Sequence, residues 1–462
     1  IPITDAEGIT LMDDIDFGSI GNVEVIKGPA GSLYGLAIAG AINLETIKPQ
    51  RGKTSIGQQV LVGGYGLSRY TTQLQIGGDR SSLLVNYGKQ HSDGFMSHSE
   101  SKKDFVNLMG EFTPNAKQSI NTYFGYSHSY DERGGELTIA QYNARDYTGN
   151  PAYIKNNAHS EIISFRAGVN HTYHFNDHVS NTSTFFGSGV SNNSSSAGGW
   201  TDKTPVNFGF RSTFDFKLEL GGDLNLSGIA GAESQKQYAK IVGYRMVADS
   251  TNLSGYNIIG DLRSNQMSQS GTTSLFTEWT LSLPSVISIT AGVGVSSMSI
   301  ELDDRVYSAA NNRPSGGRPT HYEITYDNLV SPHIAINKVF NSSFSAYASY
   351  SKGYKAPVSS NIVISTTGQL NTGLKPEVGT QFEIGTKGSL LDGKLNYQVA
   401  FFDAEFADKM TSVAVPLNGT TTAYTYIANG GSQQNRGLEI STTYNLIQSN
   451  EGTFKMVRPF AN

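Results

Sequence analysis

Alternation of apolar and polar side chains is the feature that most limits how this chain can fold. The alternation begins after Gly52 and recurs along most of the remaining sequence. In the stretch 117–127, Phe124 and Tyr126 share one face, and polar or small residues share the other. Because successive side chains of a β-strand point to opposite faces, this period predicts strands with one apolar face. The same pattern returns in three more stretches, 288–296, 343–350 and 394–401.

The connections between these stretches are alternately short and long. We expect about 16 complete strands between Ser55 and Leu446, with a further one starting near Thr453. Short turns on one side and long loops on the other are typical of a bacterial outer-membrane barrel. The short turns fall near 78–79, 114–115, 176–177, 221–223, 284–285, 341–342, 392–393 and 450–452. The long segments are 92–103, 129–158, 191–202, 240–266, 302–320, 355–376 and 410–434.

Composition removes several classes of function. Charged residues are 16% of the chain, against about 25% in a typical soluble domain. The net charge of −5 is not that of a polyanion-binding protein, so we expect no nucleic-acid partner. The absence of cysteine excludes disulfide frameworks, thiolate metal sites and cysteine nucleophiles. No apolar run approaches about 18 residues, so the sequence predicts no transmembrane helix.

A soluble all-β fold is the alternative to a membrane barrel. A propeller repeats a blade sequence every ~40–50 residues, and no such repeat is present. A sandwich of this length would be divided into several domains by linkers, and no linker is visible. The apolar face persists on almost every expected strand, as a closed barrel in lipid requires. The fold class is therefore all-β, with an antiparallel transmembrane β-barrel.

Residues 20–49 carry a motif that is specific to one family. The segment runs from a short apolar strand through Gly-Pro to Tyr-Gly, and then through small residues to Ile-Asn. It strongly resembles the second half of the plug domain of TonB-dependent outer-membrane receptors. The family's usual Gly-Gly before Ile-Asn is Gly40-Ala41 in this chain. The matching residues are Ile20, Val23, Glu24, Val25, Lys27, Gly28, Pro29, Leu33, Tyr34, Gly35, Gly40, Ile42 and Asn43.

The residues of the same segment also indicate its local structure. A compact insert with little charge suits packing inside a lumen. A phosphate-binding loop is not expected, because Gly-Lys-Ser/Thr is missing and Pro29 has no N–H to donate. We expect a strand, a short helix and a second strand over Val23–Ile26, Gly31–Tyr34 and Ala41–Thr46.

The barrel part carries a looser resemblance to the same family. The similarity covers 350–357, 371–377, 383–387 and 435–439, and these sequences are commonest in ferric-siderophore receptors. The resemblance implies that residues 1–52 are the C-terminal part of the plug domain. It also implies that residues 53–462 form a barrel with about 16 of 22 strands, incomplete at its C-terminus. We expect a fragment truncated at both ends, without the signal peptide, the TonB box and the first plug strands.

The resemblance implies active import across the outer membrane of a Gram-negative bacterium. The expected ligand is a ferric siderophore, and the TonB–ExbB–ExbD complex is expected to supply the energy. We expect a monomer in contact with outer-membrane lipid and lipopolysaccharide. Neither enzymatic activity, nor catalytic residues, nor a covalently bound cofactor is expected. The plug motif residues are Glu24, Lys27, Gly28, Pro29, Tyr34, Gly35, Gly40 and Asn43.

Three other functions remain open at this point. The same class of receptor could carry haem, cobalamin or an oligosaccharide. A passive porin of about 16 strands is compatible with the strand number, but the plug motif argues against an open lumen. A soluble or surface-anchored β-rich adhesin belongs to a different class, and detergent-dependent solubility would distinguish it from a barrel.

Candidate ligand contacts lie in the long segments. Arginine together with tyrosine and tryptophan suits an anionic, aromatic ferric chelate through charge and stacking. We also expect Lys27 to pair with a barrel-wall carboxylate such as Glu377 or Glu383. The candidates are Tyr130, Arg133, Tyr142, Arg145, Trp200, Tyr244, Arg245, Arg305, Arg313, Arg318 and Tyr354.

No metal site is expected. His171, His174 and His178 span a strand end and its turn, so alternation separates their rings. The adjacent Asp303 and Asp304 lie in an expected external loop, where contact with calcium or solvent is favoured over acid–base catalysis.

Overall fold

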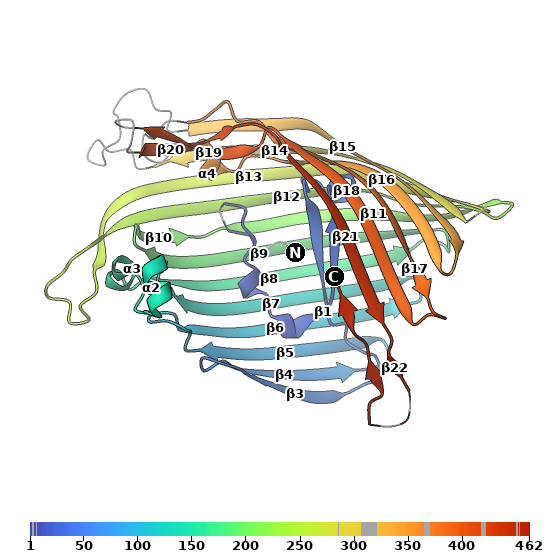
Figure 1. Cartoon of the computed structure of the whole chain (residues 1–462), viewed down its shortest axis with the longest axis horizontal. Coiled ribbons are helices and arrows are strands. Elements are labelled where there is room, and N and C mark those ends of the chain that lie inside the picture. The colour runs from blue at the N-terminus through green and yellow to red at the C-terminus, as the bar shows by residue number, and fades with distance from the viewer. Residues whose placement is uncertain are drawn as a thin grey trace.

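The dominant feature of the structure, a computed structural model, is a closed antiparallel β-barrel (Figure 1). The structure describes residues 1, 4–5, 7–284, 286–305, 321–364, 370–416, 422–449, 451 and 453–462. The strands lie around the barrel in chain order, each antiparallel to its neighbour. They are β3 (Ser55–Val62), β4 (Ser68–Gly77), β5 (Ser81–Ser92), β6 (Ser101–Asn115), β7 (Gln118–Glu132), β8 (His159–His174), β9 (Val179–Ser196), β10 (Gly199–Lys203), β11 (Val206–Gly221), β12 (Leu224–Val247), β13 (Ile258–Leu283), β14 (Ile287–Asp304), β15 (His321–Asn341), β16 (Phe344–Lys355), β17 (Glu377–Leu390), β18 (Leu395–Ala407), β21 (Gln433–Tyr444) and β24 (Phe460–Ala461).

Two of the described barrel strands are short, β10 with five residues and β24 with two. β10 pairs with both β9 and β12, which are also the neighbours of β11. It therefore lies between these two strands in the part of the wall that β11 does not reach. The remaining barrel strands between Ser55 and Tyr444 agree in number with the sequence-based expectation. The predicted all-β barrel is confirmed.

The two ends of the barrel differ. Short turns join the strands at the right end of Figure 1, and the left end carries the long connections. Three segments that we expected to be irregular contain strands instead. The segment 191–202 contributes to β9 and β10, and 240–266 extends β12 and β13. The segment 410–434 contains the hairpin β19 (Met410–Pro416) and β20 (Thr422–Asn429). Their pairing comes from backbone hydrogen bonds, which Ser- and Asn-rich sequence does not reveal.

Short elements occupy the rest of the described connections. At the long-loop end lie α2 (Ile139–Ala144), α3 (Pro151–Lys155) and α4 (Ser359–Ile362). β22 (Ile447–Gln448) and β23 (Met456–Val457) form a small separate sheet. Most of the expected loop 302–320 lies outside the described residues. Among the described residues, no helix is long and apolar enough to cross a membrane.

The two faces of the wall have opposite chemistry. In β8, Phe165 and Val169 point outward and are 51% and 40% exposed, whereas Ser164 and Arg166 point inward and are buried. Outward aromatic rings near the short-turn end contact one another in a row along neighbouring strands. The row consists of Tyr173, Phe175, Phe214, Phe216 and Trp279. This pattern is that of a barrel with a lipid-facing outer surface and a polar lumen.

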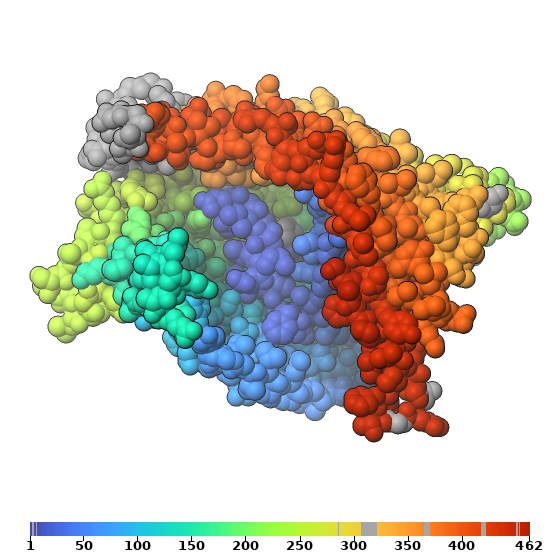
Figure 2. Space-filling view, in the orientation of Figure 1, coloured from blue at the N-terminus to red at the C-terminus, as the bar shows by residue number. Residues whose placement is uncertain are grey.

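A segment inside the barrel precedes the first wall strand. Figure 1 and Figure 2 show it within the hollow of the wall, in dark blue. Its β1 and β2 pair antiparallel, and α1 contacts β13, β14, β15 and β16. The expected order of strand, helix and strand is confirmed, and the two strands are antiparallel neighbours. The elements are η1 (Met12–Asp14), η2 (Phe17–Ser19), β1 (Ile20–Lys27), α1 (Gly31–Tyr34) and β2 (Gly40–Thr46).

Replacing Phe165 by arginine should destabilise the barrel. Phe165 points outward in the middle of β8, where a positive charge facing lipid costs about 2–4 kcal/mol. The control is Tyr142→Arg, because Tyr142 is 68% exposed on α2 outside the wall. Urea titration of the protein in lipid vesicles measures both free energies of unfolding. Equal stability of Phe165→Arg and the unsubstituted protein would contradict a lipid-facing outer surface.

Candidate functional site

A buried ion pair anchors the inner segment to the wall. Asp16 caps η2, where its carboxylate accepts the Gly18 N–H at 2.9 Å. The same carboxylate pairs with Arg69 on β4, and the two side chains are 0% and 3% exposed. Asn107 on β6 donates to its second oxygen at 2.9 Å, and the Arg69 guanidinium lies 3.8 Å from the centre of the Phe17 ring. Both charges are thus paired and hydrogen-bonded, which compensates for their burial.

A second carboxylate of the inner segment lies close by and is less well satisfied. The Ser129 hydroxyl donates to Asp14 Oδ1 at 2.9 Å. Asp14 Oδ2 is buried and has no hydrogen-bond partner among the described residues. Burial raises the pKa of the Asp14 carboxyl, and the hydrogen bond from Ser129 and the charge of Lys103 oppose that shift. The site therefore favours a protonated acid.

The short helix α1 rests directly on the wall. A Cβ atom added to Gly294 of β14 would lie 2.3 Å from the Gly31 carbonyl oxygen. A Cβ atom added to Gly353 of β16 would lie 2.3 Å from the Ala37 carbonyl oxygen. Both wall positions require glycine, because only a residue without Cβ allows so close an approach of two backbones.

Polar side chains of the wall hold both ends of α1. Ser32 donates to Glu278 of β13 at 3.1 Å, and His333 of β15 lies 2.8 Å from the same carboxylate oxygen. At the other end, Arg211 of β11 donates to the Leu33 carbonyl oxygen at 3.1 Å. A guanidinium is favourable there, because the last carbonyls of a helix carry partial negative charge.

Three of the plug motif residues meet in one hydrogen-bond group. Asn43 on β2 donates to Glu24 on β1 at 2.9 Å and to the Tyr34 hydroxyl at 3.0 Å. Gly40 has a φ of 142°, and a Cβ there would lie 2.2 Å from the Ile26 carbonyl oxygen. These contacts fold the segment onto itself, so they are structural within the inner segment. The connections between β1, α1 and β2 contain three further motif residues, Gly28, Pro29 and Gly35.

Lys27 binds a wall carboxylate, but not one of the two that we expected. Its Nζ lies 2.5 Å from Glu439 on β21. Glu383 instead accepts a hydrogen bond from Tyr347 at 2.7 Å, and Glu377 is buried. The expected partners were wrong, because both carboxylates have other partners: Glu383 accepts from Tyr347, and Glu377 accepts the Met410 N–H at 2.7 Å. The side chains of Lys27 and Glu439 are 64% and 43% exposed, so this pair contributes about 0–1 kcal/mol.

At the long-loop end, three of the candidate ligand residues come together around a histidine. The His159 ring stacks on Tyr130 with 5.1 Å between centroids, and Trp200 meets it edge-on at 5.5 Å. Tyr244 is the cross-strand neighbour of Trp200, and Trp200 Nε1 donates to Asp202 at 2.7 Å. This aromatic cluster combines residues of β7, β8, β10 and β12. His159 is not among the sequence-based candidates, because a single histidine at a strand end forms no pattern.

The other candidates do not join the aromatic cluster. No ring contact, hydrogen bond or ion pair joins them to it within the described residues. Arg145 ends α2 in the left-handed region, with φ 55°. The exposed candidates are Arg133, Tyr142, Arg145, Arg245 and Arg305. Arg313 and Arg318 lie outside the described residues.

Tyr354 has a packing role. It is partly buried against an apolar cluster at the long-loop end, and Leu36 of the inner segment packs against the same cluster. The Tyr326 hydroxyl donates to the Leu374 carbonyl oxygen at 3.2 Å within it. The apolar cluster therefore connects the inner segment to the external connections. Its buried members are Ile300, Tyr326, Leu329, Ala356, Ile362 and Leu374.

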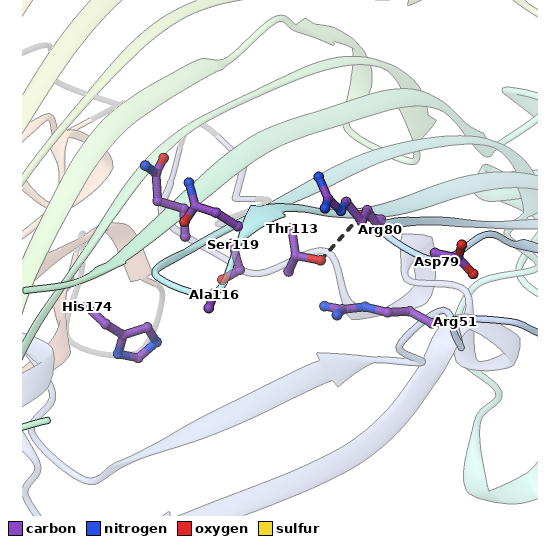
Figure 3. A pocket seen from close by; sticks show the side chains of 9 residues that line it. Arg51, Asp79, Arg80, Thr113, Ala116, Ser119 and His174 are labelled. Carbon is purple, nitrogen blue, oxygen red and sulfur yellow. Dashed lines mark hydrogen bonds between the residues drawn. The ribbon is translucent and has the colours of Figure 1, made fainter. Parts of the chain in front are cut away.

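Three cavities lie beside the described part of the inner segment, and another lies at the short-turn end. The smallest of the three, about 170 Å³, lies next to Thr4 and Gly8. The first cavity, of about 520 Å³, separates residues 34–41 from β12 and β13. The second, of about 560 Å³, is bordered by Lys27, Glu383 and Glu439. The cavity at the short-turn end has a volume of about 390 Å³ and is shown in Figure 3, where Thr113 donates to the Arg80 carbonyl oxygen at 3.3 Å. It is lined by Arg51, Asp79, Arg80, Thr113, Asn115, Ala116, Gln118, Ser119 and His174.

One group of potential metal ligands occurs among the described residues. Glu301, Asp303 and His321 place one ligand atom each within 4.8 Å of one another. His321 Nδ1 already lies 2.8 Å from Asp303 Oδ1, so the imidazole has a partner without any ion. His171 and His178 bind Gln118 and the Lys217 carbonyl oxygen instead of joining each other.

Comparison with protein families finds one match, the model for "TonB dependent receptor-like, beta-barrel", over residues 59–461. Solved structures with the same fold include the ferric-catecholate import receptor Fiu from E. coli K12, at 17% identity and TM-score 0.71. The ferric citrate transporter FecA matches at 16% identity and TM-score 0.71. The siderophore receptor PiuA from Acinetobacter baumannii matches at 17% identity and TM-score 0.72.

The match includes most of this chain but only part of each relative. It covers 93% of this chain and 67% of Fiu, 94% and 62% for FecA, and 93% and 66% for PiuA. This chain therefore spans about two thirds of the length of these proteins.

Breaking the Asp16–Arg69 pair should loosen the inner segment. Removing one partner of a buried ion pair costs about 3–5 kcal/mol, because the other charge remains buried without compensation. We expect this loss for Asp16→Ala and for Arg69→Ala, and about 0–1 kcal/mol for the exposed pair in Lys27→Ala. Amide hydrogen exchange over residues 12–27 measures the local stability. The double variant Asp16→Leu/Arg69→Met should recover much of the loss. A loss from Lys27→Ala equal to that from Asp16→Ala would overturn this ranking.

Asp14→Asn should stabilise the protein at neutral pH. The raised pKa of Asp14 means that this group stabilises the folded protein less as the pH rises above about 3.9, the ordinary aspartate value. The amide stays neutral, so the variant should exceed the unsubstituted protein in unfolding free energy at about pH 7 and match it at about pH 4. Urea titration at the two pH values tests this. Lower stability of Asp14→Asn at neutral pH would show that the site prefers the carboxylate.

Proposed function

Because the chain belongs to the TonB-dependent receptor family, we propose that it imports a ferric siderophore across the outer membrane of a Gram-negative bacterium. The observation that carries this proposal is the segment held inside the lumen. A passive porin needs an open water-filled lumen. In this structure, the buried Asp16–Arg69 pair and the close contact of α1 with the wall hold a folded segment inside the lumen. A barrel with a fixed inner segment requires a driving force to admit its ligand.

We assign residues 1–52 to the C-terminal part of a plug domain and residues 53–462 to the barrel. The inner elements end with β2, and the first wall strand β3 begins at Ser55. The TonB–ExbB–ExbD complex would move the plug from the periplasmic side, using the inner-membrane proton gradient. The chain makes and breaks no covalent bond in the ligand. Its residues bind the ligand, orient it and close the path behind it.

The cargo is assigned from the long-loop end of the barrel. The aromatic cluster of Tyr130, His159, Trp200 and Tyr244 lies at that end. Tyr130 and His159 share the outward face of β7 and β8 with Tyr126 and Phe165, so the cluster offers its rings at the outer rim of the barrel rather than inside the lumen. Stacking on aromatic rings suits the flat, electron-rich rings of a catecholate chelate. The named relatives support iron as the cargo, since Fiu is a ferric-catecholate import receptor and FecA a ferric citrate transporter. The iron chelate is the transported substrate in this proposal.

Haem, cobalamin or an oligosaccharide remain alternative cargoes for the same receptor. Each could stack on the aromatic cluster, so the choice depends on direct binding. The porin alternative loses its support, because the inner segment occupies the lumen.

Ferric-chelate binding should quench the fluorescence of Trp200 and leave that of Trp279 almost unchanged. Trp200 belongs to the aromatic cluster, whereas Trp279 stacks on Phe216 in the outward row with 5.2 Å between centroids. Titration of the protein in detergent with ferric tris-catecholate and with ferric citrate measures the quenching. Trp200→Phe should remove most of it, and Trp279→Phe should retain it. Trp200→Ala should weaken binding about tenfold, or about 1.4 kcal/mol.

Uptake of radioactive iron by whole cells provides the functional test. A protonophore should stop the uptake if TonB drives it. Uptake that continues at the same rate after the proton gradient collapses would contradict active import and favour a pore. Saturable binding of haem or cobalamin with no binding of either iron chelate would change the cargo and leave the transport class intact.

A further inference from the structure

Three side chains that can ligate a metal lie together on the wall at the long-loop end. Glu301 and Asp303 are near the end of β14, and His321 is the first residue of β15. Asp303 and His321 are directly opposite each other in the antiparallel pair. His321 Nδ1 lies 2.8 Å from Asp303 Oδ1 and 4.0 Å from Glu301 Oε1. The pairing of the two strands therefore brings an imidazole nitrogen and two carboxylates to one point.

This group faces outward, away from the inner segment. Ile300 and Leu302 alternate with Glu301 and Asp303 along β14, and they are 0% and 4% exposed on the inner side of the wall. Because successive side chains of a strand point to opposite faces, Glu301 and Asp303 point to the outer surface. The side chains of Glu301, Asp303 and His321 are 41%, 40% and 53% exposed. The group is thus open to the solution at the outer rim of the barrel.

The negative charge of this surface lacks a balancing side chain. Glu301 is directly opposite Glu323, and like charges in that position destabilise an antiparallel pair. Within the described residues, no lysine or arginine forms an ion pair with Glu301, Asp303 or Glu323. On the other side of β14, Glu301 and Asp303 are opposite Gln269 and Met267, which carry no charge. A bound cation would relieve a repulsion that the sheet otherwise retains.

The kinds of ligand atom indicate which cation fits. Ca²⁺ and Mg²⁺ take oxygen ligands, whereas imidazole is a preferred ligand of Zn²⁺ and other divalent ions of the first transition row. Ligand atoms about 2.1 Å from a tetrahedral zinc ion lie roughly 3.4 Å from one another. The 2.8 Å and 4.0 Å separations from His321 Nδ1 lie on either side of that value. Small side-chain rotations are therefore enough to form the shell.

We propose that Glu301, Asp303 and His321 form a binding site for a divalent transition-metal ion, such as Zn²⁺, on the outer surface of the barrel. Each residue supplies one ligand atom, and water completes the shell. The ion joins the end of β14 to the start of β15 and offsets the repulsion between Glu301 and Glu323. Because the site lies outside the lumen, this inference is independent of the imported cargo.

Calorimetric titration with ZnCl₂ tests the site directly. The protein is kept in detergent and is first freed of metal with a chelator. We expect saturable binding of Zn²⁺, and at least about tenfold weaker binding of Ca²⁺ because of the imidazole. His321→Ala and Asp303→Asn should each lower the affinity for Zn²⁺ at least about tenfold, since even the loss of an outer-shell partner costs about 10–100-fold.

A second histidine with two carboxylates provides the matched control. His91 lies 2.9 Å from Asp93 and 3.8 Å from Glu100, but Lys102 pairs with Glu100 at 2.7 Å. This lysine already balances the charge that a metal would need. His91→Ala should therefore leave the affinity for Zn²⁺ within about twofold of the unsubstituted protein.

Thermal unfolding distinguishes a ligand from a neighbouring charge. An ion that binds only the folded protein raises its Tm, so Zn²⁺ should raise the Tm of the unsubstituted protein and leave that of His321→Ala unchanged. Glu323→Gln removes the repulsion without removing a ligand, so it should raise the Tm in the absence of metal. Heat-modifiable migration on a gel verifies that each variant is folded.

Three results would overturn the site. They are the absence of Zn²⁺ binding to the unsubstituted protein, full Zn²⁺ affinity in folded His321→Ala and Asp303→Asn, and an equal loss of affinity in His91→Ala. Tighter binding of Ca²⁺ than of Zn²⁺ would contradict the assigned class of cation.

Discussion

Closure of the backbone hydrogen bonds is the constraint on which the rest of this structure depends. A strand in lipid can satisfy its N–H and C=O groups only through neighbouring strands, so the wall must be a closed sheet. Closure fixes two faces with opposite surroundings. Residues such as Phe165 and Val169 face outward, and residues such as Ser164 and Arg166 face the lumen. The low charge content and the alternation of the sequence both follow from this division.

A polar lumen determines how the inner segment can be held. The wall offers hydroxyl, amide and charged groups there, so docking relies on ion pairs, hydrogen bonds and close backbone contacts. Asp16 with Arg69 is the most deeply buried of these contacts, and Lys27 with Glu439 is largely exposed. Such contacts release in steps more easily than one continuous apolar core, because each is local. Under the proposed import function, this suits a segment that stays in place at rest and shifts when the ligand enters.

The sequence predicted the elements that depend on a local pattern of residues. It did not predict the contacts between strands that are far apart in the chain. The alternation of apolar and polar residues predicted the strands of the wall. The Gly-Pro and Tyr-Gly sequences predicted where β1, α1 and β2 begin and end. The partner of Lys27 could not be predicted, because the strand that faces β1 across the lumen depends on barrel closure. His159 was missed for a similar reason: its contacts with Tyr130 and Trp200 join three strands. The hairpin β19–β20 has no apolar alternation strong enough to distinguish it from a loop.

Cross-linking the inner segment to the wall tests the central claim most directly. An added Cβ at Gly35 would lie 3.9 Å from the Ser274 Cβ, close to the mean spacing of about 3.8 Å in a disulfide. The chain has no cysteine of its own, so the pair Gly35→Cys/Ser274→Cys has no competing thiol. We predict that this pair forms a disulfide in intact membranes. The control pair Gly35→Cys/Leu275→Cys should form none, because Leu275 faces outward. Free thiols in the first pair that react with a bulky reagent would show that the segment does not lie in the lumen.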